Sequence, residues 1–266
     1  MNIPPIIYGT AWKNNLTKTL VLQAIKVGYR AIDTANQRKH YYEEGVGKAI
    51  VNSGIPREQL FLQTKFTYAT GQDRRLPYDR HADIRTQVQQ SFQSSLEHLS
   101  TNYLDSYLLH GPSTSVGLTV VDWQAWQEME KIHQEKKTRH LGISNVNLWQ
   151  LQELYQKATI KPTFVQNRCY AQLGWDKELR EYCKKKEIIY QGFSLLTANS
   201  FILPQLQPIA TRLNTTPTQV IFKFAMQSGI VPLTGTTNSK HMKEDLALDF
   251  TLTEKDIEFI DNIALQ

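Results

Sequence analysis

The sequence predicts a (β/α)8 TIM barrel, an α/β fold in which eight parallel strands close into a ring inside a layer of helices. Three observations carry this prediction. Short apolar, β-branched runs alternate with longer amphipathic runs along the whole chain. Eight short runs fit into 266 residues, which suits one barrel domain over residues 1–266. No Gly-x-Gly-x-x-Gly string follows the first run, which counts against an open doubly wound sheet.

The strands and helices follow in alternation. The expected strands span residues 5–9, 29–33, 60–65, 104–110, 140–144, 163–167, 188–193 and 230–233. Apolar residues recur at helical spacing in 16–25, 84–99 and 255–263. Thr216 reads as an N-cap with Pro217 at the first helical position, and Gly229 ends that helix. Residues 67–81 predict a loop over one face of the barrel.

Composition narrows the class of protein. Hydrophobic residues make up 41% and charged residues 21%, enough for a buried core. No run of about 20 apolar residues is present, and the start does not resemble a secretory signal. Two cysteines cannot build a disulfide framework or a multi-cysteine metal site, so we expect reduced thiols in the cytosol.

The charge balance is basic, with a net charge of +5 and a pI near 9.0. The basic residues are scattered, and the longest cluster, residues 184–186, reads as an exposed helix face. No nucleic-acid motif accompanies it, so we expect no nucleic-acid partner and no metal. A small anionic ligand such as a nucleotide phosphate fits the balance equally well.

Polar residues end five successive predicted strands. They are Asp33, Lys65, His110, Ser144-Asn145 and Gln166-Asn167. Each alone suits an ordinary role, such as an N-cap, a surface lysine or a core histidine. Their succession indicates a site, because barrel enzymes place their working residues where strands end and βα loops begin.

A buried lysine and aspartate at such a site need one another, since an unpaired buried charge costs several kcal/mol. An ammonium near a phenol stabilises the phenolate and lowers the tyrosine pKa. Such a tyrosine can give a proton to a carbonyl oxygen as hydride arrives at carbon. Tyr41 and Tyr42 follow Asp33 closely enough to reach the same end of the barrel.

Taken together, these strings resemble the aldo-keto reductase family over nearly the whole chain. Residues 28–35 and 43–47 are similar to its first signature, and Thr64-Lys65 to its lysine strand. Residues 104–110 resemble its histidine strand, and 141–145 its Gly-x-Ser-Asn segment. The resemblance implies a catalytic tetrad of Asp33, Tyr41, Lys65 and His110.

The tyrosine is the least settled member of that tetrad. The family places it five residues after the aspartate, and Arg38 stands there in this chain. The loop looks about two residues longer than usual, which puts His40 near the slot and Tyr41 beside it. We assign the role to Tyr41 because a phenol is needed. Tyr42 and His40 are the alternatives.

The resemblance further implies a reduced nicotinamide dinucleotide, NADPH, lying across the barrel mouth. By position, its contacts would include Gly9, Thr10, Ser144, Asn145, Gln166, Phe193, Ser194, Leu196, Thr234, Gly235, Thr236, His241 and Asp245. Ser144, Asn145 and Gln166 would bind the carboxamide, and Phe193 would stack on the ring. Gly235 and His241 replace the lysine and arginine that hold the 2′-phosphate in the family, so NADH is the alternative donor.

For the substrate, the resemblance implies a small carbonyl compound, and a monomer is the commoner habit of the family. The short loop after His110 and the early end of the chain predict an open mouth lined by Trp12, Tyr68 and Trp175.

Three functions remain open at this point. The first is an NAD(P)H-dependent reductase of aldehydes or ketones. The second is a cofactor-binding sensor or regulatory protein that kept the barrel and lost turnover, which the altered tyrosine loop keeps in view. The third is an aldolase or lyase with Lys65 as a Schiff-base nucleophile, which requires Lys65 to be free of Asp33.

Overall fold

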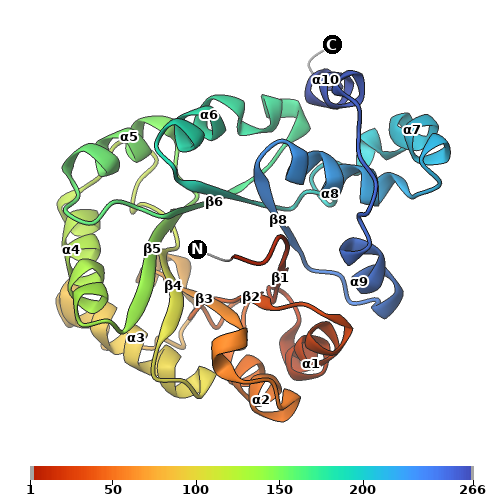
Figure 1. Ribbon diagram of the computed structural model, residues 1–266. Helices are drawn as coiled ribbons and strands as arrows, with labels where there is room; N and C mark the ends of the chain where they lie inside the picture. Colours follow the sequence, from red (N-terminus) through yellow and green to blue (C-terminus); the bar gives the residue numbers. More distant parts are fainter. Residues whose placement is uncertain (1–2, 265–266) are drawn as a thin grey trace.

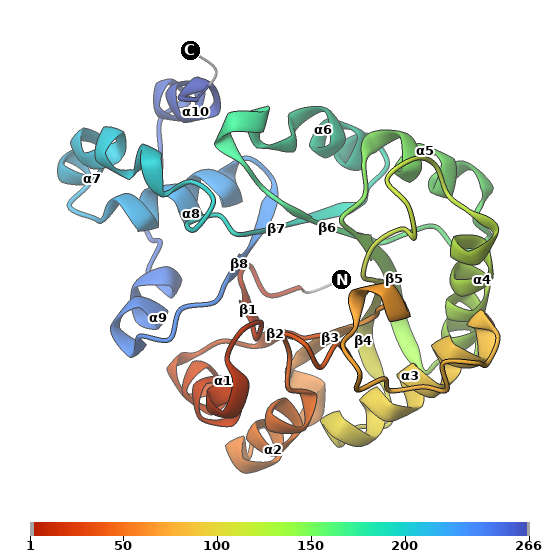
Figure 2. The same cartoon turned by 180° about the vertical axis from the view of Figure 1, so that it is seen from behind.

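The computed structural model describes residues 3–264 and contains eight parallel strands that form a closed barrel in chain order. Figure 1 looks along the barrel axis and Figure 2 from the opposite end. The predicted (β/α)8 barrel is therefore confirmed. The strands are β1 (Ile7–Gly9), β2 (Ala31–Asp33), β3 (Phe61–Phe66), β4 (Leu104–Leu109), β5 (Thr138–Ser144), β6 (Phe164–Arg168), β7 (Ile189–Phe193) and β8 (Ile230–Thr234).

All eight predicted strands are present, with ends that differ by one or two residues. β1 begins at Ile7 rather than at residue 5. Pro4 and Pro5 lack the N–H group that a strand ladder uses. β2 begins at Ala31 rather than at residue 29, because the N–H of Tyr29 donates to the oxygen of Ala24 at the end of the preceding helix.

Helices surround the barrel. They are α1 (Thr17–Val27), α2 (Glu43–Ser53), α3 (Ile84–Leu99), α4 (Val120–Gln134), α5 (Leu148–Lys157), α6 (Lys177–Lys185), α7 (Gln207–Arg212), α8 (Pro217–Gln227), α9 (Ser239–Leu246) and α10 (Glu254–Asn262). The predicted start of α8 is confirmed: Thr216 caps it and forms a reciprocal capping box with Gln219. The helix ends at Gln227, two residues before Gly229, which continues the chain with a φ of 77°.

The core has two parts, one inside the barrel and one between the strands and the helices. Inside, the apolar side chains of Ile7, Ala31, Phe61, Phe164 and Leu233 pack together. Outside, alternate residues of the same strands, such as Ile32 and Leu62, pack against the helices. Because side chains alternate along a strand, residues two apart on β3 face the same side.

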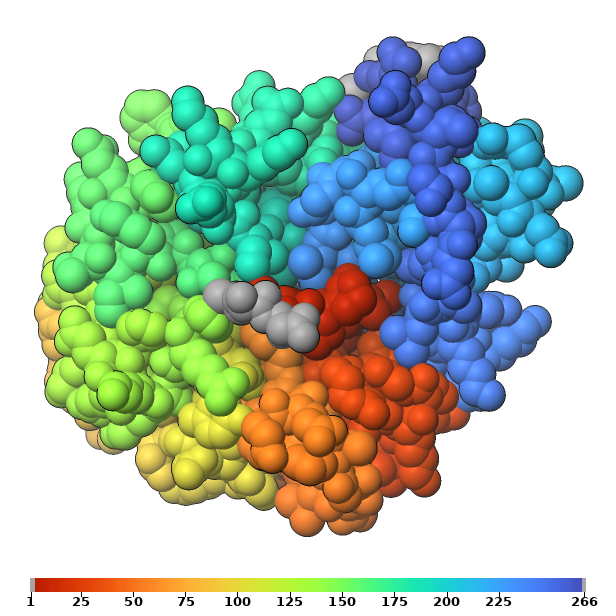
Figure 3. Space-filling view, in the orientation of Figure 1, coloured from red at the N-terminus to blue at the C-terminus, as the bar shows by residue number. Residues whose placement is uncertain are grey.

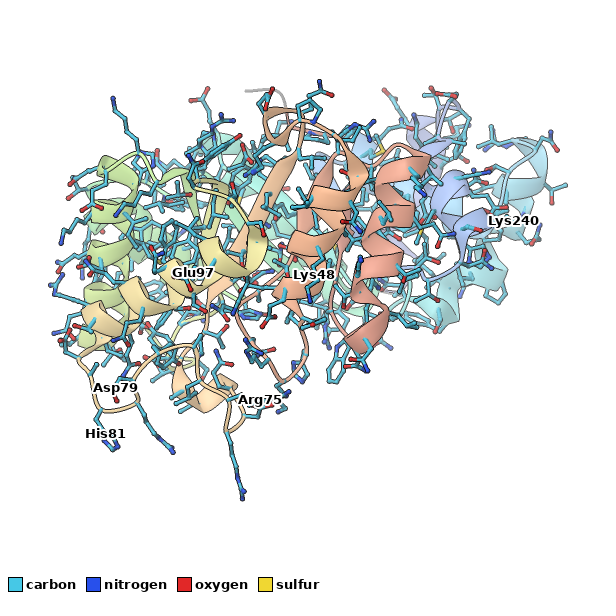
Figure 4. All side chains as sticks on the ribbon, turned by 90° about the horizontal axis from the view of Figure 1, so that it is seen from below. Lys48, Arg75, Asp79, His81, Glu97 and Lys240 are labelled. Carbon is cyan, nitrogen blue, oxygen red and sulfur yellow. The ribbon has the colours of Figure 1, made fainter. Side chains whose placement is uncertain are left out.

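The two ends of the barrel differ in their covering. Figure 3 shows the N-terminal segment, in red, lying over the middle of the end where the strands begin. At the other end the loop after β3 projects beyond the helices, and Arg75, Asp79 and His81 lie on it in Figure 4. This projecting loop coincides with the irregular segment predicted over residues 67–81, apart from a short 3-10 turn at Ala69–Gly71.

Two further expectations concern the chain as a whole. Cys169 and Cys183 are both buried and neither forms a disulfide. Among residues 3–264 no helix is long and apolar enough to cross a membrane.

Candidate active site

A buried ion pair lies at the carboxyl end of β2 and β3. The Lys65 ammonium donates to Asp33 Oδ1 at 2.8 Å and Oδ2 at 2.7 Å, and to the backbone oxygen of Thr34 at 2.7 Å. These three bonds use all three of its N–H groups. Both side chains are almost fully buried. Burial lowers the pKa of Lys65, and the nearby Asp33 carboxylate opposes that shift.

Tyr41 lies between this ion pair and His110. The Lys65 nitrogen is 5.4 Å from the centroid of the Tyr41 ring, and the His110 ring centroid is 6.0 Å from it at 69°. Burial raises the pKa of Tyr41, and the Asp33 charge adds to the shift. The direction is opposite to the expected lowering. Its physical reason is that the phenol is shielded from water, while the N–H groups of Lys65 are all taken by Asp33 and Thr34.

His110 follows β4 and is held by the loop after β3. Its Nδ1 lies 2.6 Å from the Thr67 hydroxyl. Burial, followed by the charge on Lys65, lowers the pKa of His110 to about 3. The imidazole is therefore neutral near pH 7. If the Thr67 hydroxyl donates to Nδ1, the proton sits on Nε2, which is then a donor.

The long loop between β2 and α2 determines which side chain reaches the ion pair. Arg38 turns away from the barrel to pair with Glu44 on α2 and to lie 3.1 Å from His98 Nε2 on α3. Tyr42 sits at the N-cap of α2 against the backbone of Gly45.

His40 stacks on Trp12, with ring centroids 3.8 Å apart. Tyr41 alone of the three candidates has its ring beside Lys65. The structure thus brings Asp33, Tyr41, Lys65 and His110 together, as the sequence analysis expected.

The residues expected to bind a carboxamide meet at the ends of β5 and β6. The Ser144 hydroxyl donates to the backbone oxygen of Gln166 at 2.6 Å. Asn145 has a φ of 52° and donates through Nδ2 to the backbone oxygen of His110 at 2.8 Å. Gln166 instead points its Nε2 into the barrel, 2.9 Å from Asp33 Oδ1 and 2.9 Å from Gln191 Oε1.

At the end of β7, Phe193 is half-buried, and the Arg168 guanidinium lies 5.7 Å from its ring centroid. Ser194 follows with a φ of 59°, a left-handed conformation that is costly for a residue with a side chain. Leu196 packs against the outer core.

The ends of β1 and β8 form a narrow cradle. Thr10 Oγ1 donates to the backbone oxygen of Asp33 at 3.0 Å, and the Tyr8 hydroxyl donates to that of Thr236 at 2.9 Å. A Cβ on Gly9 would come 3.5 Å from the oxygen of Thr234.

Lys13 lies in this cradle and was missed in the sequence analysis. It is only 5% exposed, and its ammonium donates to the backbone oxygen of Gly235 at 2.6 Å. It forms no ion pair within residues 3–264. Burial lowers its pKa to about 8. A buried cation without a carboxylate partner is the electrostatic feature that an anionic ligand would complete.

Two residues of α9 were expected near the adenosine end of a dinucleotide. His241 is exposed. Asp245 is buried and accepts a hydrogen bond from Thr234 Oγ1 at 2.6 Å. Its carboxyl group faces Thr234 rather than solvent, and burial raises its pKa to about 6.

The three residues expected to line the mouth of the barrel differ in how exposed their side chains are. Trp12 is 70% exposed. Tyr68 is half-buried and donates through its hydroxyl to Asp122 at 2.8 Å. The expectation for Trp175 is wrong. Its side chain is fully buried and donates to the backbone oxygen of Ile260, and its ring lies 4.9 Å from that of Phe224. It anchors α10 to the barrel.

Sequence reasoning also missed Gln63 and Gln191, which the structure places next to the ion pair. Gln63 donates to Asp33 Oδ1 at 2.7 Å and to Gln191 Oε1 at 2.8 Å. A signal was present: Gln63 stands two residues before Lys65, so period-two alternation puts both side chains inside the barrel.

Lys65 has no free N–H group, and Asp33 binds it through both oxygens. The Schiff-base hypothesis requires a lysine free of that carboxylate, so the geometry contradicts it.

The fold and the site together define a TIM-barrel oxidoreductase in which a half-buried phenol lies beside a lysine–aspartate pair. The family model described as "Aldo/keto reductase family" matches residues 5–265, and the chain belongs to this family. The chain is similar to a glyoxal reductase of Bacillus subtilis, with 34% identity over 91% of this chain and 81% of that protein.

Two other relatives extend the comparison. A 9,11-endoperoxide prostaglandin H2 reductase of Trypanosoma cruzi is 34% identical over 93% of this chain and 82% of its own length. The structure of a Bombyx mori aldo-keto reductase in complex with NADP superposes with a TM-score of 0.83 at 26% identity, covering 98% of this chain and 89% of that one. The resemblance found in the sequence is confirmed, and the protein is an oxidoreductase that reduces carbonyl groups.

Proposed function

We propose that this protein reduces aldehydes or ketones to alcohols with NADPH as the hydride donor and Tyr41 as the proton donor. The observation that carries the proposal is the position of the Tyr41 ring, 5.4 Å from the buried Lys65 ammonium and edge-on to His110. A phenol and an imidazole in adjacent positions can both form hydrogen bonds to the same carbonyl oxygen.

The chain's own residues divide the work on that oxygen. Tyr41 is protonated and neutral before the substrate arrives, since an ordinary tyrosine pKa already lies near 10 and burial raises the pKa of Tyr41 further. Lys65 lies over the ring and stabilises the negative charge that develops as the proton leaves. Neutral His110, with Thr67 on Nδ1, orients the carbonyl oxygen through Nε2.

The residues at the rim fit a nicotinamide dinucleotide, which when bound supplies the hydride. Lys13 is a buried cation whose one hydrogen bond is to a backbone oxygen, which suits a phosphate group. A side chain at position 235 would begin with a Cβ in van der Waals contact with the Lys13 nitrogen, at 3.6 Å, and Gly235 places no such side chain against the ammonium. The Bombyx mori relative in complex with NADP supports NADPH as the donor, with NADH as the alternative because Gly235 and His241 lack a guanidinium's grip.

A Tyr41→Phe variant tests the proposal directly. We expect turnover of glyoxal and of an aromatic aldehyde to fall by about 100-fold or more, because the proton donor is lost. NADPH binding, measured by quenching of protein fluorescence, should change by less than about 3-fold. Oxidation of NADPH is followed by its absorbance.

Tyr42→Phe is the matched control, since Tyr42 lies outside the site against α2. Turnover that persists in Tyr41→Phe and disappears in Tyr42→Phe would refute the assignment. Wild-type protein that binds NADPH and reduces neither aldehyde would contradict the proposed activity.

A further inference from the structure

Three buried glutamines lie directly beneath the ion pair, inside the barrel. They are Gln63 on β3, Gln166 on β6 and Gln191 on β7, and none is more than 3% exposed. The register brings them together, because Gln191 pairs with Gln166 in the ladder and Asp33 pairs with Gln63.

Their amides form a closed ring of hydrogen bonds with Asp33. Gln63 Nε2 lies 2.7 Å and Gln166 Nε2 lies 2.9 Å from Asp33 Oδ1. The same two nitrogens lie 2.8 Å and 2.9 Å from Gln191 Oε1. Gln191 Nε2 then donates to Gln63 Oε1 at 3.1 Å.

The carboxylate decides which way the amides face. An ionised Asp33 only accepts hydrogen bonds, so Gln63 and Gln166 must both present their NH2 groups to it. Gln191 Oε1 receives the second N–H of each. Reversing either amide would place its oxygen against the carboxylate.

The fold does not need these amides. The next layer of the barrel interior is apolar, with Phe61, Phe164 and Leu233 packed together. Aliphatic side chains in place of Gln63 and Gln191 would continue that layer and would leave one buried N–H of Gln166 without its acceptor, Gln191 Oε1. The contacts that these two amides add, and that aliphatic residues lack, are the bond from Gln63 to Asp33 and the bonds among the three glutamines.

We propose that Gln63 and Gln191 are positioning residues that hold the Asp33 carboxylate in place beneath Lys65. Gln63 acts on Asp33 by direct donation, and Gln191 acts by orienting the amides of Gln63 and Gln166. A carboxylate held in this way keeps the Lys65 ammonium beside Tyr41. This catalytic consequence rests on the proposed function, whereas the effect on Asp33 does not.

Three charged or titratable groups lie around Asp33, each on a different segment of the chain. They are Lys65 on β3, Tyr41 in the loop before α2, and His110 after β4. Glu43 on α2 acts on Lys65 from outside the barrel. The substitutions proposed below leave all four unchanged.

The test is a double variant, Gln63→Met with Gln191→Met, which keeps the length of both side chains and removes both amides together. The carboxyl 13C signal of Asp33, assigned with Asp33→Asn, is followed by NMR against pH in the cofactor-free protein. We expect the midpoint of Asp33 protonation to rise by about 1 pH unit or more in the double variant. The carboxylate loses the hydrogen bond from Gln63, and the amide of Gln166, its other glutamine donor, loses Gln191 as the partner that orients it.

Gln150→Met is the matched control. Gln150 is equally buried on α5, but it bonds the backbone of the loop at Thr114 and Gly117, far from Asp33 in the hydrogen-bond network. Its loss should lower stability without moving the Asp33 signal. The single Gln63→Met variant should give most of the shift.

Kinetics separate this inference from the proposed function. If the wild type reduces aldehydes, the acid limb of its kcat/KM profile should move up with the NMR midpoint in the double variant. The inference is overturned if the Asp33 signal changes with pH in the same way in the wild type and in the folded double variant. It is also overturned if the Asp33 carboxyl group stays ionised in both proteins down to the pH at which they unfold. A wild type without turnover, whose Asp33 midpoint nevertheless moves in the double variant, would refute the proposed function and leave the amide network supported.

Discussion

Lys13 offers a test in which stability and ligand binding should change in opposite directions. Lys13→Met removes a buried charge and keeps most of the aliphatic stem. The ammonium has one hydrogen bond, to Gly235 O at 2.6 Å, and no ion pair within the described residues 3–264. We therefore expect the free protein to become more stable near pH 7 and to bind NADPH less tightly.

The magnitude follows from the pKa of Lys13, which burial lowers from 10.5 to about 8. A difference of about 2.5 pKa units corresponds to a cost of about 3 kcal/mol for holding the charged form in the folded state. Because the folded pKa is the lower one, this cost is complete below pH 8 and fades as the pH rises toward 10.5. The lost bond to Gly235 offsets about 1 kcal/mol. A net gain of about 2 kcal/mol at pH 7 should remain.

Urea unfolding at pH 7 and pH 10 measures the change, with Lys26→Met on the exposed face of α1 as the control. The gain in the Lys13 variant should shrink toward zero at pH 10, and the control should show no such dependence. NADPH affinity should fall by about 10-fold or more, because a charge-assisted bond to phosphate is lost. A Lys13 variant that is less stable at pH 7 and binds NADPH normally would refute the reasoning.

Two further predictions use the same physical chemistry. Asp245→Asn should stabilise the protein by up to about 3 kcal/mol at pH 8 and have little effect at pH 4. Burial raises the Asp245 pKa from 3.8 to about 6, so the cost of ionising it in the folded protein builds between these two pH values and is complete above pH 6. Urea unfolding at pH 4 and pH 8 measures the difference. Aldehyde reduction should show no inflection near pH 6.5, because the pKa of His110 lies near 3. Alcohol oxidation should rise with pH through pH 10, because the pKa of Tyr41 is raised. Steady-state rates in both directions check this, and an inflection near pH 6.5 in the reduction profile would contradict the assigned state of His110.

The sequence was enough for the fold and for most of the candidate site. Eight β-branched runs specify eight strands because each must be buried on both faces of a parallel barrel. Asp33, Lys65 and His110 were found because each ends such a run, and parallel strands deliver their ends to one rim. Thr216 and Pro217 marked the start of α8 through local backbone chemistry alone.

Other features depend on contacts between distant segments. Trp175 is a large aromatic residue in a predicted loop, which suggested a place at the barrel mouth. Its indole instead donates to the backbone of Ile260, 85 positions along the chain, and is buried there. Lys13 is isolated in sequence, and only the closure of β1 against β8 puts it beneath Gly235. The direction of the Tyr41 pKa shift likewise depended on burial, which no spacing of residues reports.

Local pattern therefore determined which strands form, which way each side chain faces and which polar groups arrive at the rim, because these follow from periodicity and burial along one segment. Barrel closure decided which of those groups touch. It placed Gln63, Gln166 and Gln191 around Asp33, and it brought Asp33 and Thr34 to the hydrogen-bond donors of Lys65. Hydrogen bonds between strands far apart in sequence act over a few ångströms, so only the assembled ring of strands could set them.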